Sequence, residues 1–254
     1  EQGFLSLEFS SLFRGNSFEN SHCMATDDCG NVYLGGDTDS TDFFLENFQD
    51  STISSGIPDG FITKLNSSNQ IVWSTYWGGS AYDAVFDIAT DSLGNLYVVG
   101  QTGSNDFPLL NAQDSTLNGF SDCFISKFSN ETELLWSTYF GGSSGESALS
   151  VAIDKWGSCY VTGETQSSDF PTTIDALDDT LNGTSDCFVT KFSTNGNLIW
   201  SSYLGGSGDQ DQGNAIVVDR RDDVIIVGET DSYDFPLVGY SFDGTYEGGL
   251  DGFV

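Results

Sequence analysis

Basic residues are scarce in this chain. It has seven lysines and arginines against 38 aspartates and glutamates, which gives a formal net charge of −31. Nucleic-acid binding needs a surface that neutralises phosphates, so this balance excludes it, and anionic membranes are equally poor partners. Such a charge instead favours cations and basic surfaces.

Long apolar runs and histidine are nearly absent as well. No stretch of about 18 apolar residues occurs, so this segment is not predicted to insert into a membrane. His22 is the only histidine, which excludes a His-rich zinc or haem site and leaves a catalytic triad a single candidate base. Because His22 occupies the same repeat position as Phe86 and Leu149, we interpret it as a structural residue.

The five cysteines cannot all pair with one another. Cys123 and Cys187 stand where two other repeats have glycine, and Cys159 replaces an apolar residue, so we interpret these three as small buried thiols. Cys23 and Cys29 are six residues apart around a predicted hairpin, and a disulfide between them is an open alternative. Neither spacing is that of a zinc site.

What the chain has in abundance is internal repetition. WSTYWGGS begins at Trp73, WSTYFGGS at Trp136 and WSSYLGGS at Trp200, with spacings of 63 and 64 residues. A degenerate copy of this motif, FSSLFRGN, begins at Phe9, 64 residues before Trp73. A fixed spacing of this size is the signature of a repeat architecture.

Four further anchors recur in register with the tryptophans. An Asp within a hairpin pattern occurs at Asp27, Asp91, Asp154 and Asp219. A Gly-x-Thr motif ends at Thr38, Thr102, Thr165 and Thr230. A loop motif, Asp-Phe-Pro in three of its copies, begins at Asp42, Asp106, Asp169 and Asp234. An Asp-x-Phe motif opens a further apolar run at Asp59, Asp122, Asp186 and Asp251.

These anchors divide each repeat into four short strands. Two β-prone runs joined by a polar link predict a hairpin, a long loop follows, and a second hairpin ends in the tryptophan strand. No helical periodicity competes with this pattern, so the fold class is all-β, a β-propeller of four-stranded antiparallel blades in four units of about 63–64 residues. We expect the Gly-Gly pair to supply backbone freedom at the crossover between blades, and the tryptophans to fill the gap between them.

The order WSTYLGGS, D-x-x-GN-x-Y-V-x-G-x-T, DFP and D-x-F-x-x-KF resembles the SBBP repeat family. The resemblance covers essentially the whole chain and implies a propeller of secreted or cell-surface bacterial and archaeal proteins that is usually not an enzyme. We predict one domain over residues 1–254. Its parts are an N-terminal outer strand (1–17), three repeats (18–80, 81–143 and 144–207) and a partial fourth repeat (208–254).

The two ends of the chain predict how the propeller closes. The run from Leu5 to Phe13 is in phase with a fourth strand, while the last repeat stops inside its third strand. We expect the N-terminal strand to complete the last blade and close a four-blade ring, because closure removes free sheet edges. The alternatives are a segment of a larger propeller and an array completed by a neighbouring chain.

One set of acids recurs just after the crossovers, at Glu19, Asp83, Glu146 and Asp211. In a ring these carboxylates would converge on the central axis, where a hard cation such as calcium would neutralise them. Solvated loop carboxylates are the alternative, since the chain has no compact calcium loop. Buried acids of unequal character would instead favour an enzyme, such as a glycan-active hydrolase or lyase.

The function predicted from these observations is a non-catalytic module at the cell surface or outside the cell. Its long loops would recognise a protein or glycan partner, or neighbouring copies of the same chain, and the alternative is a propeller that binds a cation or small ligand. Scarce lysine and three sequons, at Asn66, Asn130 and Asn182, point to the same location and to glycosylation.

Overall fold

The computed structural model describes residues 9–53, 56–239, 246 and 248–254, and within them every regular element is a β-strand. The strands form four antiparallel sheets, each built from consecutive strands, which we call blades 1 to 4. This confirms the predicted all-β propeller architecture. The described part of the chain contains no helix that is long and apolar enough to cross a membrane.

The strand bounds follow the repeat. Blade 1 consists of β1 (Glu19–Thr26), β2 (Val32–Thr38), β3 (Asp59–Leu65) and β4 (Ile71–Trp77). Blade 2 consists of β5 (Asp83–Thr90), β6 (Leu96–Thr102), β7 (Asp122–Phe128) and β8 (Leu134–Phe140). Blade 3 consists of β9 (Glu146–Ile153), β10 (Cys159–Thr165), β11 (Asp186–Phe192) and β12 (Leu198–Leu204). Blade 4 consists of β13 (Asp211–Val218), β14 (Val224–Thr230) and β15 (Asp251–Phe253).

Tight turns join the first two strands of each blade because an aspartate caps them. Asp91 directly follows β5, and its Oδ1 accepts hydrogen bonds from the backbone N–H groups of Leu93 (2.9 Å) and Asn95 (3.0 Å). Gly94 has a φ of 78°, a left-handed conformation that glycine adopts without strain. The recurrent Asp therefore caps the turn in each of the four blades.

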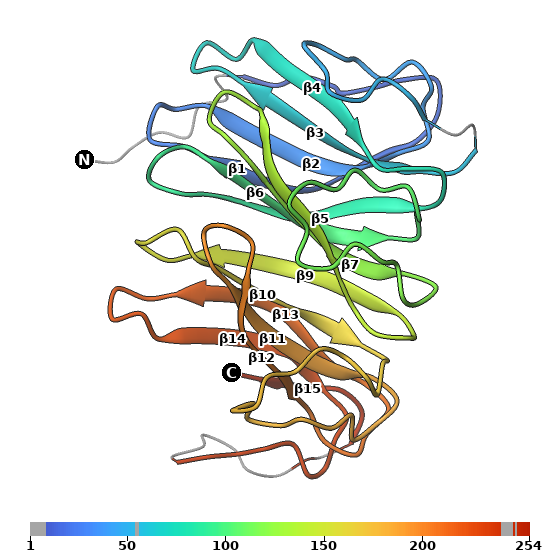
Figure 1. The fold of residues 1–254 in the computed structure, drawn as a ribbon. Coiled ribbons are helices and arrows are strands. Elements are labelled where there is room, and N and C mark those ends of the chain that lie inside the picture. The colour runs from blue at the N-terminus through green and yellow to red at the C-terminus, as the bar shows by residue number, and fades with distance from the viewer. Residues whose placement is uncertain (1–8, 54–55, 240–245, 247) are drawn as a thin grey trace.

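The blades stack face to face, from blade 1 at the top of Figure 1 to blade 4 at the bottom. The first strands of successive blades, β1, β5, β9 and β13, contact one another. Aromatic side chains fill the space between faces, and Trp77 of blade 1 packs edge-on against Phe128 and Phe107 of blade 2. Trp73 and Trp136 are 1% and 3% exposed, which confirms that these tryptophans are buried between blades.

A bulge in the first strand of each blade explains the glycine of the Gly-x-Thr motif. The register of β5 against β6 shifts between Val85 and Asp87, so one extra residue stands in β5. The bulge brings the Ala84 carbonyl oxygen so close to β6 that a Cβ on Gly100 would lie 1.9 Å from it. A side chain at this position is therefore excluded by space.

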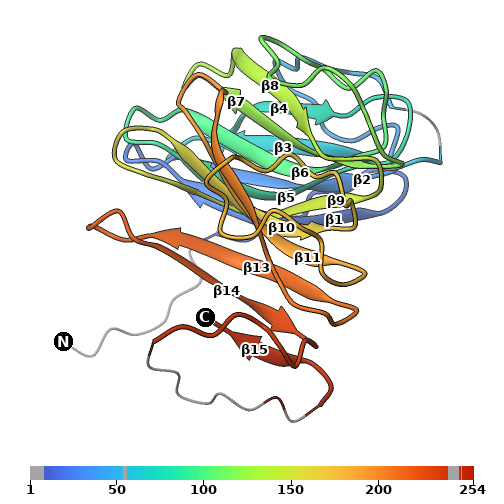
Figure 2. The ribbon, with the colours of Figure 1, turned by 60° about the horizontal axis from the view of Figure 1, so that its bottom comes forward.

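The prediction of a ring closed by the N-terminal strand is wrong for the described residues. They form an open arc, with blades 1 and 4 at opposite ends (Figures 1 and 2). The only strand paired with β15 among the described residues is β14, and residues 9–13 form no strand. The rest of the predicted strand, residues 1–8, lies outside the described residues. No described strand pairs with the outer edge of β15, so blade 4 lacks the fourth strand that closure by the N-terminus requires.

Candidate functional site

The crossover between blades is built around one buried acid. Asp83 is the first residue of β5, and its Oδ2 accepts hydrogen bonds from Gly79 N (2.7 Å) and Ser104 Oγ (2.7 Å). Ser104 Oγ in turn accepts a hydrogen bond from Ala81 N (2.8 Å), two residues farther along the crossover. The acid and the serine together therefore hold the loop that leads from one blade to the next.

The same arrangement recurs at the other crossovers. Asp211 Oδ2 accepts from Gly206 N and Ser232 Oγ, both at 2.8 Å. Glu146 Oε2 accepts from Gly142 N at 3.0 Å, and Glu19 Oε1 accepts from Ser40 Oγ. The serine was missed by the sequence reasoning, although a Thr-x-Ser pattern recurs at Ser40, Ser104, Ser167 and Ser232.

A second acid, from the preceding blade, lies beside three of these, Asp83, Glu146 and Asp211. A Cβ on Gly78 would be 2.7 Å from Asp83 Oδ2 and 3.0 Å from Asp59 Cγ, so both carboxyl groups border the same glycine. The equivalent pairs are Asp122 with Glu146 around Gly141, and Asp186 with Asp211 around Gly205. We call these three places junctions 1, 2 and 3. Each junction joins the third strand of one blade to the first strand of the next.

This geometry corrects the predicted reason for the Gly-Gly pair. Neither Gly78 nor Gly79 is among the glycines with positive φ. Gly78 faces the two carboxyl groups, and a Cβ on Gly79 would lie 2.5 Å from Asp106 Oδ1. The pair is therefore required by lack of space, and backbone freedom is not the reason.

Burial changes the acidity of the paired carboxyls. Burial, and after it the neighbouring Asp83, raises the pKa of Asp59 to about 8. Burial also raises the pKa values of Asp83, Asp122 and Asp186 to about 6 each, and that of Glu146 above its usual range. Since these side chains are at most 1% exposed, the alternative of solvated loop carboxylates does not describe them.

The structure does not bring Glu19, Asp83, Glu146 and Asp211 together. Each lies at its own crossover, and in the described part of the chain no three or more His, Cys, Asp or Glu side chains form a group that could hold a metal ion. Asp83, Glu146 and Asp211 are buried, as expected for an enzyme, whereas Glu19 is only partly buried, and all four recur at equivalent positions of the repeat, as expected for a structural role. Calcium binding by this set stays a prediction.

Two equivalent pockets open over junctions 1 and 3. The pocket at junction 3, of about 290 Å³, is lined by Asp178, Asn182, Gly205, Gly206, Asp234 and Pro236, among others. The pocket at junction 1, of about 300 Å³, is lined by Asp50, Thr52, Gly78, Gly79, Asp106 and Pro108, among others. The acids at the two rims correspond in the repeat, since Asp50 matches Asp178 and Asp106 matches Asp234. Loops and crossovers therefore share one face of the arc, which we call the crossover face.

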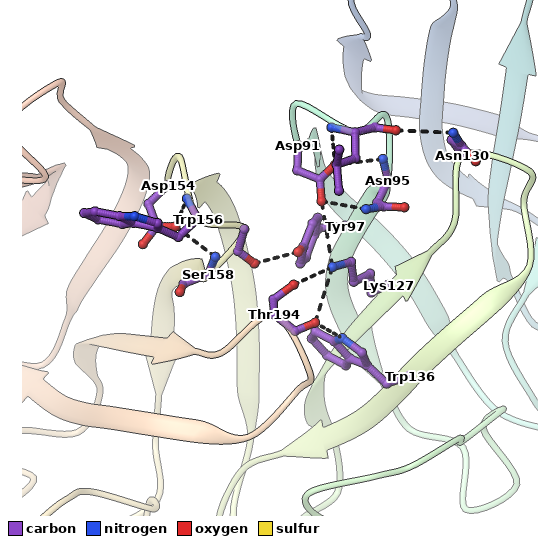
Figure 3. Close-up of polar contacts among 12 residues, drawn as sticks. Asp91, Asn95, Tyr97, Lys127, Asn130, Trp136, Asp154, Trp156, Ser158 and Thr194 are labelled. Carbon is purple, nitrogen blue, oxygen red and sulfur yellow. Dashed lines mark hydrogen bonds and ion pairs between the residues drawn. The ribbon is translucent and has the colours of Figure 1, made fainter.

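The opposite edge of the arc is held by contacts between blades (Figure 3). Lys127 Nζ lies 4.6 Å from the centre of the Tyr97 ring and donates to Thr194 Oγ1 (2.8 Å) in the β11–β12 turn of blade 3. Trp136 Nε1 donates to the Thr194 carbonyl oxygen (3.0 Å), and Tyr97 OH donates to the Gly157 carbonyl oxygen (2.6 Å). The polar groups of Lys127, Trp136 and Tyr97 are all bonded to the next blade, so this edge has a structural role.

His22 and the cysteines have no site of their own. His22 Nε2 lies 2.5 Å from Asp37 Oδ1, and its ring packs edge-on against Phe86. All five cysteines, each within the described residues, are free, so the Cys23–Cys29 alternative is not formed. Burial raises the pKa values of the Cys159 and Cys187 thiols to about 12, which makes them unreactive at neutral pH.

Comparison with known protein families finds a match at the segments that contain these junctions. Three segments match the family model described as a beta-propeller repeat, SBBP, at residues 72–108, 135–171 and 199–236. These three segments are SBBP repeats. No curated protein matches it significantly.

Each SBBP match straddles a junction. The match at 72–108 runs from β4 through the crossover and β5 to the loop that contains Asp106 and Pro108. The acid, the serine and the Gly-Gly pair thus belong to the repeat that defines the family, which is in general a non-catalytic repeat module. The third-strand acid, Asp59, precedes the match.

Proposed function

We propose that this chain is a non-catalytic interaction module, located outside the cell or at its surface, whose crossover face binds a protein or glycan partner. The observation that supports this most strongly is the pair of equivalent pockets at junctions 1 and 3. A surface that repeats along an arc suits a partner with repeated groups, and acids at each rim suit basic or hydroxyl groups.

Apolar side chains on the same loops favour a protein partner. Ile174 is 100% exposed and Leu177, which lines the pocket at junction 3, is 80% exposed. The corresponding loop of blade 2 exposes Phe120, and that of blade 4 exposes Val238. Exposed apolar groups beside acids are typical of interaction surfaces, since they offer area to bury and charges to select the partner.

The proposed location outside the cell is supported by composition and by the sequons. Asn130 and Asn182 are exposed, and Asn182 lines the pocket at junction 3. Glycosylation of Asn182 would cover that pocket. Labelling of intact cells with an antibody against the chain tests the location, and intact mass tests the glycans.

Binding to a printed glycan array and to an array of basic peptides tests the proposed function. The pocket variant Asp178→Asn with Asp234→Asn, and the loop variant Ile174→Ser with Leu177→Ser, should lose binding. Leu93→Ser with Asp28→Asn, at turns on the opposite edge, is the control and should bind like the parent. Loss of binding in the control alone, or binding that none of the variants changes, contradicts the proposal.

A further inference from the structure

Junction 1 contains carboxylate oxygens that no group of the described residues satisfies. Asp59 is 1% exposed and Asp83 is 0% exposed. Three of their four carboxylate oxygens, both of Asp59 and Oδ1 of Asp83, have no hydrogen-bond partner among residues 9–53 and 56–239. None of the ion pairs formed by the described residues involves either acid. Buried carboxylates of this kind destabilise the fold, because they have lost their hydrogen bonds to water without gaining hydrogen bonds to the protein.

Junction 2 shows how the same site looks when the chain satisfies it. Asp122 accepts from Asn118 N and Gly119 N, both at 3.1 Å. Glu146, one methylene longer than Asp83, accepts from Thr165 Oγ1 (2.7 Å) as well as from Gly142 N (3.0 Å). All four oxygens therefore have a donor.

Junction 3 is intermediate. Asp186 Oδ2 accepts from Asn182 N (3.0 Å), whereas Asp186 Oδ1 and Asp211 Oδ1 have no partner. The loop of blade 3 thus provides one of the two donors that the loop of blade 2 provides.

Two neighbouring carboxylates with free oxygens are the ligands that hard divalent cations prefer. Mg²⁺ is commonly held by one or two carboxylates and several waters, and Ca²⁺ takes six to eight oxygens of any kind. A cation would neutralise both charges and would also be coordinated by the carboxylate oxygens that have no hydrogen-bond partner. Protonation of one acid would remove one charge and let its O–H donate to the other carboxyl group, and the metal titration below distinguishes this alternative from cation binding. The two carboxylates would be the protein's side-chain ligands, and water would complete the coordination shell of the cation.

We propose that junction 1 binds one hard divalent cation, Ca²⁺ or Mg²⁺, between Asp59 and Asp83, that junction 3 binds a second between Asp186 and Asp211, and that junction 2 binds none. This differs from a single site on the propeller axis, because each cation bridges two successive blades. The bound ions strengthen the contact between blades, whatever the crossover face recognises.

Calorimetric titration of the chelator-treated chain with CaCl₂, and separately with MgCl₂, at constant ionic strength tests the proposal. The parent should bind two ions. Asp59→Asn with Asp83→Asn should lose one of them, whereas Asp122→Asn with Glu146→Gln, which removes the same charge at junction 2, should keep both. The arm that binds more tightly identifies the cation.

Native mass spectrometry of the parent keeps the proposal testable if the junction 1 variant does not fold. Two retained ions after transfer into a volatile buffer with trace CaCl₂ support it. An unloaded parent in both titrations, or loss of an ion in the junction 2 variant but not in the junction 1 variant, overturns it.

Discussion

At the scale of single residues, two aspartates that accept similar backbone hydrogen bonds have pKa values shifted in opposite directions. Asp154 at a turn accepts two backbone N–H groups and pairs with Lys191, and these contacts hold its pKa below the usual range although burial opposes them. Asp122 at a junction also accepts two N–H groups, yet burial and the acid beside it raise its pKa to about 6. Burial is the largest effect at Asp122, where a second carboxyl adds to it, whereas at Asp154 the hydrogen bonds and the Lys191 ammonium together outweigh burial.

Asp122 makes stability depend on pH with a definite sign. Its folded pKa lies above its ordinary 3.8, so the folded state holds the proton more tightly, and stability rises as pH falls from above 6 towards 4. At about 1.4 kcal/mol per pKa unit, the gain is at most about 3 kcal/mol. Urea unfolding between pH 8 and 4 should show a shallower pH dependence in Asp122→Asn than in the parent. Parallel curves for the two proteins would show that Asp122 does not titrate in this range.

The tryptophans differ in how far the next blade covers them. Trp136 is 3% exposed and its Nε1 is bonded to Thr194, whereas Trp200, at the same position of blade 3, is only partly buried. Trp136→Ala should therefore lower the free energy of unfolding by about 3 to 5 kcal/mol, the range for a filled core site. Trp200→Ala should cost about 1 to 2 kcal/mol. Equal losses in denaturant unfolding would contradict the assigned packing between blades.

At the scale of elements, the strands could be predicted because their anchors recur. The structure starts a third strand at Asp59, Asp122, Asp186 and Asp251, and a first strand at Glu19, Asp83, Glu146 and Asp211, as the spacing predicts. The pairing of Asp59 with Asp83 could not be predicted, because it joins strands of different blades. The free oxygens depend on loop donors such as Asn118 N, which a side-chain pattern does not reveal.

Lys127, on β7 of blade 2, bonds to Thr194 in the β11–β12 turn of blade 3 and so links the two blades. Lys127 is 4% exposed, whereas Lys155 pairs with Asp222 at the surface, where its side chain is 57% exposed. Lys127→Met should destabilise the chain by about 2 to 4 kcal/mol, because Asp91 and Thr194 lose a buried donor. Lys155→Met, the matched control, should cost less than about 0.5 kcal/mol. Thermal unfolding in which the two variants behave alike would remove the proposed tie between blades.

At the scale of the whole molecule, the repeat predicts blades but not their closure. Hairpin patterns determine which strands pair, whereas ring closure depends on the rotation between neighbouring blades, which the repeat pattern does not specify. The described residues place all complete junctions along one open arc (Figure 2). The crossover loops lie on one face, and the lysine contacts lie at the opposite edge (Figure 3). Recognition and cation binding are both proposed on the crossover face because the opposite edge is committed to structure.

Small-angle X-ray scattering of the monomeric chain in dilute solution tests this arrangement. The open arc predicts a pair-distance distribution with a long tail, reproduced by the profile calculated from four stacked blades. A compact, symmetric distribution that fits a closed four-blade disc with a central channel would contradict it.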